Sequence, residues 1–414
     1  MRALALLLLL QAQDGAPTLV SVTSRGEPNK VALVFSKPVD QATAEAAANY
    51  AIDNGVKVES AARGLDLKTV TLTTSPLVEG VTYTVKLKDG TVRTFVFVKG
   101  LFGGAPKEEP RAARLPKFSK PVLFNTPEAD AILGALQVFP KNNPWNEDIS
   151  RRPVHPDSDK LVASVGRDKA VRYNFDMCFV LVPPAQPKVD VRLTYAGESD
   201  KGPYPVPDNA PIEGWPIDGQ TLETSQQGGG ADRHLIVVDP AGGMLYEFYR
   251  AFKRTTGWEA ANEATWDLKS NRMRPRTWTS ADAAGLPIFP SLPRFDECEA
   301  GVVDHALRVT VSRTRKAFLY PASHQAGSSD SPLVPAMGQR FRLKASVDIS
   351  GFPRHAQAIA AAMKKYGMLV ADNGGDWDIS LPPDPRLKGL EALRKLKGGD
   401  FEVVVTTGEN DLNR

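Results

Sequence analysis

The sequence has no apolar run of about 18 residues and no excess of charge of one sign. The first absence excludes a transmembrane helix in the mature chain, because a helix that crosses a bilayer needs a long apolar stretch. The second, 51 basic against 48 acidic residues, argues against a nucleic-acid partner, which a strongly basic chain would indicate. We therefore expect no membrane span and no nucleic-acid binding.

Motifs of several enzyme classes are also missing. There is no G-x-S-x-G nucleophile motif, no glycine fingerprint for phosphate or dinucleotide binding, and no H-E-x-x-H, H-x-H or Cys-His spacing. Cysteine is scarce, since the chain has only Cys178 and Cys298. The sequence does not give the distance between them, so a disulfide and two buried free thiols are both open.

Residues 1–16 have the layout of a secretory signal peptide. Arg2 supplies the positive start, residues 3–10 form the apolar core, and Ala12 or Ala16 is a small residue suited to cleavage. We therefore predict export, with the mature protein secreted, periplasmic or held at the cell surface.

Residues 17–99 show short alternating strands bounded by turn residues, a pattern typical of a β-sandwich. The run VALVFSKPVDQATAEAAANYAIDNGVKVES (31–60), followed by KTVTLTTSPLVEGVTYTVKL (68–87), resembles the immunoglobulin-like domain of bacterial surface-layer and secreted multidomain proteins. The resemblance implies a spacer or presentation module without catalysis. The segment has no His and no Met, so the copper binding of some related sandwiches is not carried over.

Residues 100–121 have the composition of a basic Pro- and Gly-rich linker, and residues 122–408 form the predicted larger domain. The 33 Pro and 33 Gly residues interrupt helices, so we predict a mainly β protein. The larger domain is expected to be sandwich-like or jelly-roll-like with a few short helices, including one over 126–136 capped by Thr126. Strands are expected at 175–182, 189–195, 234–238, 245–249, 306–311 and 317–320.

Several stretches of the larger domain resemble a group of secreted bacterial proteins of uncharacterised activity. The matching stretches are NPWNEDIS (143–150), ESDKGPYPVPDNAPIEGWP (198–216), DRHLIVVD (232–239), TWTSADAAGLPIFP (277–290), HALRVTV (305–311) and YGMLVADNGGDW (366–377). The resemblance implies a single domain and supplies no chemistry.

The stretch 351–381 joins a predicted helix to a polar turn. Apolar residues recur at helical spacing up to Met363, and Gly367 follows two lysines at the expected helix end. The chain then runs through an apolar strand into the polar segment 372–376. Two interpretations are open: a hairpin whose tight turn is Asn373-Gly374, or a rigid loop that presents carboxylates, an amide and a Trp to a sugar or a metal.

Carboxylates are the first candidates for chemistry. Those in or beside loops rich in Gly, Pro or Trp are Glu213, Asp232, Asp282, Asp372 and Asp376. In such loops a carboxyl group can be partly buried and its pKa shifted, and glycoside cleavage needs two carboxyl groups. For each acid, capping of its own turn is the alternative.

Tryptophan shares three of these loops: Trp215 lies with Glu213, Trp278 with Asp282, and Trp377 with Asp376. An aromatic face stacks on a sugar ring while nearby acids and amides, such as Asn373, bind its hydroxyl groups. The pairing of Trp with acid therefore suits carbohydrate.

Histidine offers a different chemistry. His234, His305 and His324 lie at the ends of predicted strands, where converging imidazoles would bind zinc or hold a general base. A hydrogen-bonded structural role is the alternative for each.

We predict an exported carbohydrate-active enzyme, a polysaccharide hydrolase or lyase with a carboxylate pair in a Trp-lined cleft. The expected catalytic residues are Glu213, Asp232, His234, Asp372 and Asp376, and the expected substrate-binding residues are Trp215, Trp278, Asp282, Asn373 and Trp377. The alternatives are a non-catalytic protein that binds glycan or cell wall, and a metal-dependent hydrolase with His234, His305 and His324 as ligands. The expected partner is a polysaccharide or cell-wall glycan, and no cofactor is assigned.

Overall fold

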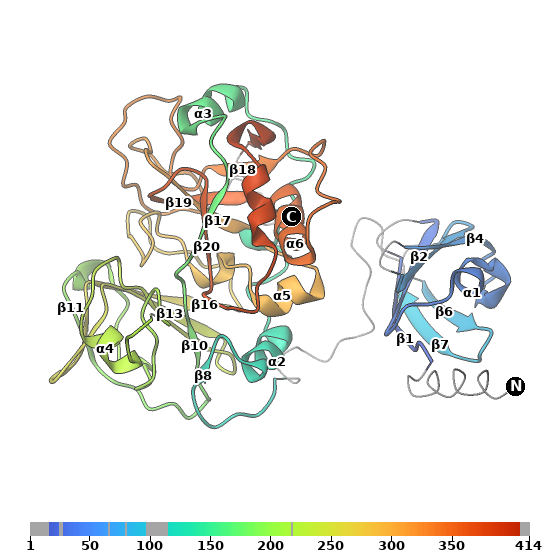
Figure 1. The fold of residues 1–414 in the computed structure, drawn as a ribbon, viewed down its shortest axis with the longest axis horizontal. Coiled ribbons are helices and arrows are strands. Elements are labelled where there is room, and N and C mark those ends of the chain that lie inside the picture. The colour runs from blue at the N-terminus through green and yellow to red at the C-terminus, as the bar shows by residue number, and fades with distance from the viewer. Residues whose placement is uncertain are drawn as a thin grey trace, which may run out of the picture. The chain divides into compact units, whose positions relative to one another are not determined.

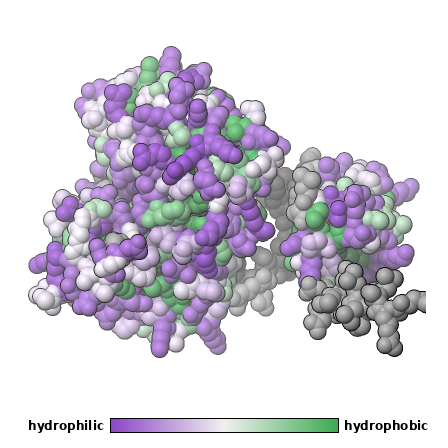
Figure 2. Space-filling view, viewed as in Figure 1, coloured by the Kyte–Doolittle hydropathy of each residue, from purple (hydrophilic) through white to green (hydrophobic). Residues whose placement is uncertain are grey.

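The computed structural model describes residues 16–24, 28–64, 67–78, 81–96, 115–216 and 218–405. They belong to two compact units, Met1–Pro110 and Arg111–Arg414 (Figure 1). The predicted signal peptide, up to residue 15, and most of the predicted linker fall outside the described residues. Among the helices in those ranges, each is too short or too polar to span a bilayer. The face seen in Figure 2 is mostly hydrophilic, with apolar residues in small patches.

The N-terminal unit is a β-sandwich of two antiparallel sheets, with strand orders β1-β2-β5-β4 and β3-β6-β7. Its elements are β1 (Leu19–Thr23), β2 (Lys30–Phe35), α1 (Gln41–Glu45), β3 (Tyr50–Ile52), β4 (Val58–Arg63), β5 (Thr69–Thr74), β6 (Thr82–Leu87) and β7 (Val92–Val96). Alternate side chains such as Leu33, Leu72 and Val85 are fully buried between the sheets. The predicted sandwich is confirmed.

The larger unit is mainly β, with three sheets. Their strand orders are β16-β13-β12-β10-β8, β21-β18-β19-β17-β20-β9 and β11-β15-β14. The strands are β8 (Val122–Leu123), β9 (Arg172–Phe175), β10 (Val180–Leu181), β11 (Val191–Leu193), β12 (Leu235–Asp239), β13 (Met244–Tyr249), β14 (Phe252–Arg254), β15 (Gly257–Ala260), β16 (Asn262–Asp267), β17 (Leu307–Val311), β18 (Arg340–Leu343), β19 (Met368–Asn373), β20 (Asp378–Leu381) and β21 (Phe401–Val403). The helices are α2 (Pro127–Ala135), α3 (Ser158–Val165), α4 (Leu222–Gln227), α5 (Phe295–Ala300) and α6 (Arg354–Lys365).

The chain crosses between the two largest sheets at residues 176–179. The expected strand 175–182 is therefore split: β9 lies at one edge of the six-stranded sheet and β10 lies in the five-stranded sheet. These sheets are separate groups of strands in Figure 1. The backbone N–H groups of Asp176 and Met177 both donate to the Leu381 carbonyl, at 3.1 and 3.2 Å. This anchors Asp176 at the crossover.

Two predicted helices are confirmed by their caps and faces. In α2, the Thr126 side chain accepts a hydrogen bond from the Ala129 N–H at 3.2 Å, and Pro127 occupies the first position. In α6, apolar residues such as Ile359 and Met363 are buried, and basic residues fill the last turn. The expected strand 317–320 is replaced by an isolated bridge at Phe318.

Of the two interpretations of the segment 372–376, the hairpin across Asn373-Gly374 is wrong. Strands β19 and β20 are not neighbours, because β17 lies between them, parallel to β19 and antiparallel to β20. The connecting loop 374–377 instead passes over the end of β17, where the Thr310 hydroxyl donates to the Gly375 carbonyl at 2.7 Å. An apolar strand gains more by pairing at both edges than a local turn gains by joining two strands directly.

A register shift places Asp372 on the polar face of the six-stranded sheet. Thr310 pairs with Asp372 and not with Ala371, because the register shifts by one residue after Val309. Side chains alternate between the two faces of a strand, so the extra residue moves Asp372 to the face of Thr310 and Arg308.

The two cysteines are free thiols. Cys178 and Cys298 are both buried in the core of the larger unit and are not bonded to each other. Burial raises the pKa of both thiols above the ordinary value, so neither is a reactive thiolate.

Trp377 is a core residue, which corrects its assignment as a sugar platform. Its side chain is fully buried and stacks on Phe401, with ring centroids 5.1 Å apart. Its Nε1–H donates to the Gly166 carbonyl at 2.9 Å. A sugar ring therefore has no access to it.

Replacing this side chain tests the core assignment. We expect Trp377→Ala to lower the free energy of unfolding of the larger unit by about 3–5 kcal/mol, because it leaves a large cavity. Urea denaturation measures the change. A loss below about 1 kcal/mol would contradict a packing role.

Candidate functional site

A buried ion pair lies at the centre of the polar face. The Arg308 guanidinium donates to both carboxylate oxygens of Asp282, from Nε at 2.9 Å and from Nη2 at 2.7 Å, and it also donates to the Ser380 hydroxyl. Arg308 is 4% exposed and Asp282 is fully buried. Burial alone would lower the pKa of Arg308, but Asp282 raises it above the ordinary value. Arg308 is therefore charged at all physiological pH values.

Asp372 lies beside this pair at the end of β19 and is partly exposed. Burial and the charge of Asp282 raise the pKa of Asp372 to about 7, although Arg308 and the Asn373 N–H act in the opposite direction. Its Oδ1 accepts a hydrogen bond from Asn373 N at 2.6 Å, and its Oδ2 accepts one from Ala283 N at 3.4 Å. Asp372 can therefore gain or lose a proton near neutral pH.

Asp176 approaches Arg308 from the crossover between the sheets. The pKa of Asp176 is raised to about 6. Burial is the largest cause, the charges of Glu213 and Asp378 add to it, and the charge of Arg308 acts in the opposite direction. The Gly214 N–H donates to the Asp176 carbonyl at 2.7 Å, which fixes the neighbouring loop. A second carboxyl group with a raised pKa therefore belongs to the same polar face.

Glu213, His234 and Tyr249 extend the site toward the five-stranded sheet. The His234 N–H donates to Glu213 Oε2 at 3.2 Å, and the His234 ring centroid lies 5.9 Å from that of Tyr249. Burial raises the pKa of Tyr249, and the charges of Asp232 and Asp372 contribute. The structure thus brings Glu213, Asp232 and His234 into the neighbourhood of Asp372.

His324 and Asp372 both form hydrogen bonds with the backbone of Ala283. Its Nδ1 lies 2.8 Å from the Ala283 carbonyl oxygen, and the N–H of that same residue donates to Asp372. A carbonyl oxygen only accepts, so Nδ1 of His324 donates this hydrogen bond. His324 is partly exposed.

Asn373 and Asp376 were predicted as site residues, but their side chains hold the loop 374–377 in place. Asp376 forms an ion pair with Lys169 and accepts a hydrogen bond from Ser312 N at 2.7 Å; these contacts hold its pKa below the ordinary value despite burial. The Asn373 amide donates to the Ala326 carbonyl at 2.9 Å. Both side chains brace the loop.

The predicted His ligand set is not assembled. Both ring nitrogens of His305 are engaged, with Glu297 at 3.2 Å and with the Ala306 carbonyl at 2.9 Å. Within the described ranges, no group of three or more His, Cys, Asp or Glu side chains is placed to hold a metal ion. The cause is that His305 faces α5, whereas His324 faces the Ala283 loop.

The other two predicted sugar-binding tryptophans, Trp215 and Trp278, are partly exposed. Trp215 packs edge-on against Phe124, with ring centroids 6.5 Å apart. Trp278 has the Arg274 guanidinium 5.4 Å from its ring centroid. Each keeps part of its surface in solvent on a loop that also bears Glu213 or Asp282.

The sequence pattern did not single out Asp176, Glu247, Arg308 and Asp378. Glu247 is fully buried, and burial raises its pKa to about 8 although backbone N–H groups of Ile288 and Phe289 donate to it. A charged residue inside an otherwise apolar strand is the signal that Glu247 and Arg308 share. Asp176 had no such signal, because the expected strand ran through it.

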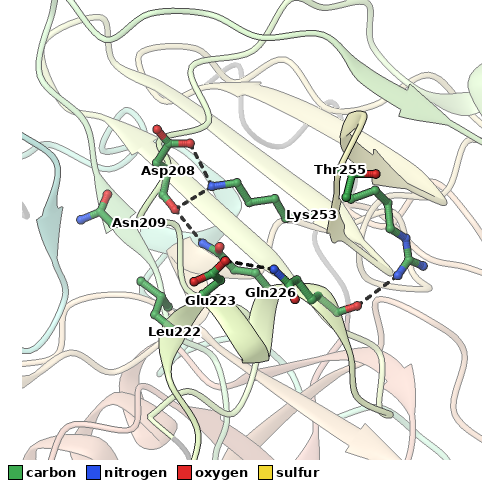
Figure 3. Close-up of a pocket in the computed structure, with 9 residues that line it drawn as sticks. Asp208, Asn209, Leu222, Glu223, Gln226, Lys253 and Thr255 are labelled. Atoms are coloured by element: carbon green, nitrogen blue, oxygen red, sulfur yellow. Dashed lines mark hydrogen bonds and ion pairs between the residues drawn. The ribbon is translucent and has the colours of Figure 1, made fainter.

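An open cavity of about 800 Å³ lies apart from these residues (Figure 3). Most residues that line it carry polar or charged groups of both signs: Lys253 pairs with Asp208 at 2.9 Å, and the Gln226 amide donates to the Asp208 carbonyl at 2.8 Å. No predicted site residue and no Trp lines it. The candidate site is therefore the cluster around Arg308, where Asp176 and Asp372, two acids with raised pKa, both interact with the same guanidinium.

Comparison with known proteins assigns no family. No family model and no curated protein matches the chain. A crystal structure of the S-layer protein rSbsC is 26% identical over 25% of this chain and 16% of that chain, with a TM-score of 0.19. A structure of SbsC domains 1-6 is 26% identical over 27% and 17%, with a TM-score of 0.18. An L,D-transpeptidase from Mycobacterium smegmatis is 14% identical over 27% and 62%, with a TM-score of 0.16.

S-layer protein structures are thus weak structural neighbours of this chain, and they are matched over less than a fifth of their own length. TM-scores this low do not assign a function.

Breaking the central ion pair tests its role. We expect Asp282→Asn to lower the free energy of unfolding by about 3–5 kcal/mol, because Arg308 is left buried without a counter-charge. The matched control is Asp330→Asn, which removes an exposed acid paired with Lys316 and should cost less than about 1 kcal/mol. Equal effects of the two variants in urea denaturation would contradict the structure.

Proposed function

We propose that the chain is an exported carbohydrate-active enzyme that works through carboxyl groups on the polar face around Arg308. Asp372 is its proton-transferring group and Asp176 is the second carboxyl group. The proposal is carried by the position of Asp372, a partly exposed carboxyl group beside the buried Arg308–Asp282 ion pair, which has a pKa raised to about 7. Such a value suits proton transfer near neutral pH.

The ion pair gives Asp372 this property. Arg308 donates to the Asp282 carboxylate, and the negative charge of Asp282 raises the pKa of Asp372, which favours its protonated form. In hydrolysis, the Asp372 carboxyl gives its proton to the glycosidic oxygen as the bond to the leaving sugar breaks. The Asp176 carboxylate either removes a proton from the attacking water or itself bonds to the anomeric carbon.

Two aromatic side chains support a sugar as the substrate. Trp215 and Trp278 are partly exposed and stand on the loops of Glu213 and Asp282. Their faces would pack on the C–H surface of sugar rings. The predicted signal peptide supports a polysaccharide or cell-wall glycan outside the cytoplasm as partner, with the N-terminal sandwich as spacer.

A non-catalytic glycan-binding protein is the second candidate. The open polar cavity with its Gln and Asn side chains favours it, because amide groups bind sugar hydroxyls without chemistry (Figure 3). Product formation separates the two functions: the enzyme releases new reducing ends from a polysaccharide panel, and the binding protein retains the polymer unchanged.

Two acids at the ends of one loop provide a matched pair of variants. We expect Asp372→Asn to reduce turnover by about 10²-fold or more, because it removes the transferred proton. Asp376→Asn should keep nearly the wild-type rate, because that residue is tied to Lys169. Reducing-sugar release measures both. Undiminished turnover in Asp372→Asn would remove Asp372 from the mechanism.

The pH profile gives an independent test. The reactive form has Asp176 ionised and Asp372 protonated, so kcat/KM should rise as pH increases through about 6 and fall as pH increases through about 7. The residual activity of Asp372→Asn should lack the fall above pH 7. A profile that stays flat from pH 5 to about 9 in the wild type would contradict the assignment.

A further inference from the structure

The polar face of the six-stranded sheet has buried acceptors without donors. Oδ1 of Asp176 and Oδ1 of Asp378 are buried, and no described residue donates a hydrogen bond to either atom. Arg308 acts electrostatically on both acids, but its Nε and Nη2 donate to Asp282 and its Nη1 donates to Ser380. The protein's central cation is therefore committed elsewhere.

Asp378 lies next to the edge strand β9 of the six-stranded sheet. Its side chain is 6% exposed, and its Oδ2 accepts a hydrogen bond from Asn174 at 3.1 Å and lies 3.6 Å from Arg172. Asn174 and Arg172 are exposed on the edge strand β9. Oδ1 of the same carboxyl group lies buried next to this edge and has no hydrogen-bond partner among the described residues.

A third polar group lacks a partner on the side of Glu213. His234 is 2% exposed, and its Nδ1 is buried without a hydrogen bond to any described residue. Its ring lies against that of Tyr249, and the charge of Asp372 contributes to the raised pKa of Tyr249. Unpartnered buried groups thus occur on both sides of the cluster.

The charges of the cluster do not balance. Arg308 is matched by Asp282, and Arg172 is matched by Asp378. Three further carboxyl groups face the same region. The charge of Arg233 acts on Glu213, which leaves Asp176 and Asp372 in excess. Unpartnered carboxylate oxygens require donors, which hydroxyl and ammonium groups supply and which carboxylate, sulfate or phosphate groups do not.

We propose that this site binds a glycan whose sugar units carry free amino groups, in preference to a neutral glycan of the same backbone and against an anionic one. The inference rests on the proposed function for the sugar class, and on the acceptors around Asp176 and Asp378 for the charge. The ammonium group replaces the missing donors, and an anionic group meets an excess of negative charge.

Binding to three matched oligosaccharides tests this preference with the full mature chain. The probes are a glucosamine oligomer, the N-acetylglucosamine oligomer of the same length, and that N-acetylated oligomer with its primary alcohols oxidised to carboxylates. Isothermal titration calorimetry should give a Kd at least about tenfold lower for the first than for the second, and the weakest binding for the third. The difference should shrink as salt is added.

A charge variant and its control locate the preference. Asp378→Asn keeps the size of the side chain and should reduce the advantage of the amine-bearing oligomer to about threefold or less. Asp176→Asn gives the same readout should the first variant fail to fold. Asp330→Asn removes an exposed acid paired with Lys316 and should leave the preference unchanged.

The outcomes separate this inference from the proposed function. Binding in the expected order without any product removes the enzyme and keeps the inference. Turnover of an anionic polymer that depends on Asp372 keeps the enzyme and overturns the inference. Equal or tighter binding of the oxidised oligomer, binding of none of the three, or an unchanged preference in Asp378→Asn also overturns it.

Discussion

The buried ion pair between Arg308 and Asp282 is the constraint on which the larger unit's polar face depends. Through it and the Ser380 hydroxyl, one side chain connects β17, β20 and the loop that contains Asp282. Because the pair is removed from water, the charge of Asp282 is poorly screened and acts on Asp372. The same contact therefore holds the geometry and sets the proton affinity of the proposed catalytic group.

Two irregularities of the strands place the carboxyl groups of Asp372 and Asp176 next to this ion pair. The shifted register between β17 and β19 turns Asp372 to the face of Arg308, and the crossover after β9 places Asp176 at the same cation. Neither position belongs to a regular ladder. An irregular backbone next to a buried charge commonly marks a functional site, where strand geometry yields to the placement of a side chain.

The sequence predicted the parts of the fold that depend on local pattern. Alternation identified the N-terminal sandwich, and spacing and capping residues identified α2 and α6. Loop composition also selected Glu213, Asp282 and Asp372, which the structure brings together. It failed at Trp377 and Asp376, because whether a loop side chain turns inward depends on long-range packing against Phe401 and Lys169. The alternating pattern of β17 likewise does not show that Arg308 is paired with Asp282 on a loop distant in sequence.

The protonation state of Asp372 is the most direct test of this account. Carboxyl carbon-13 NMR of the mature chain, with the resonance assigned through its absence in Asp372→Asn, follows that group alone as pH is varied. The account predicts a midpoint at about pH 7. A midpoint near the ordinary aspartate value of about 4 would contradict it, because Asp372 would then be ionised and unable to donate a proton at neutral pH.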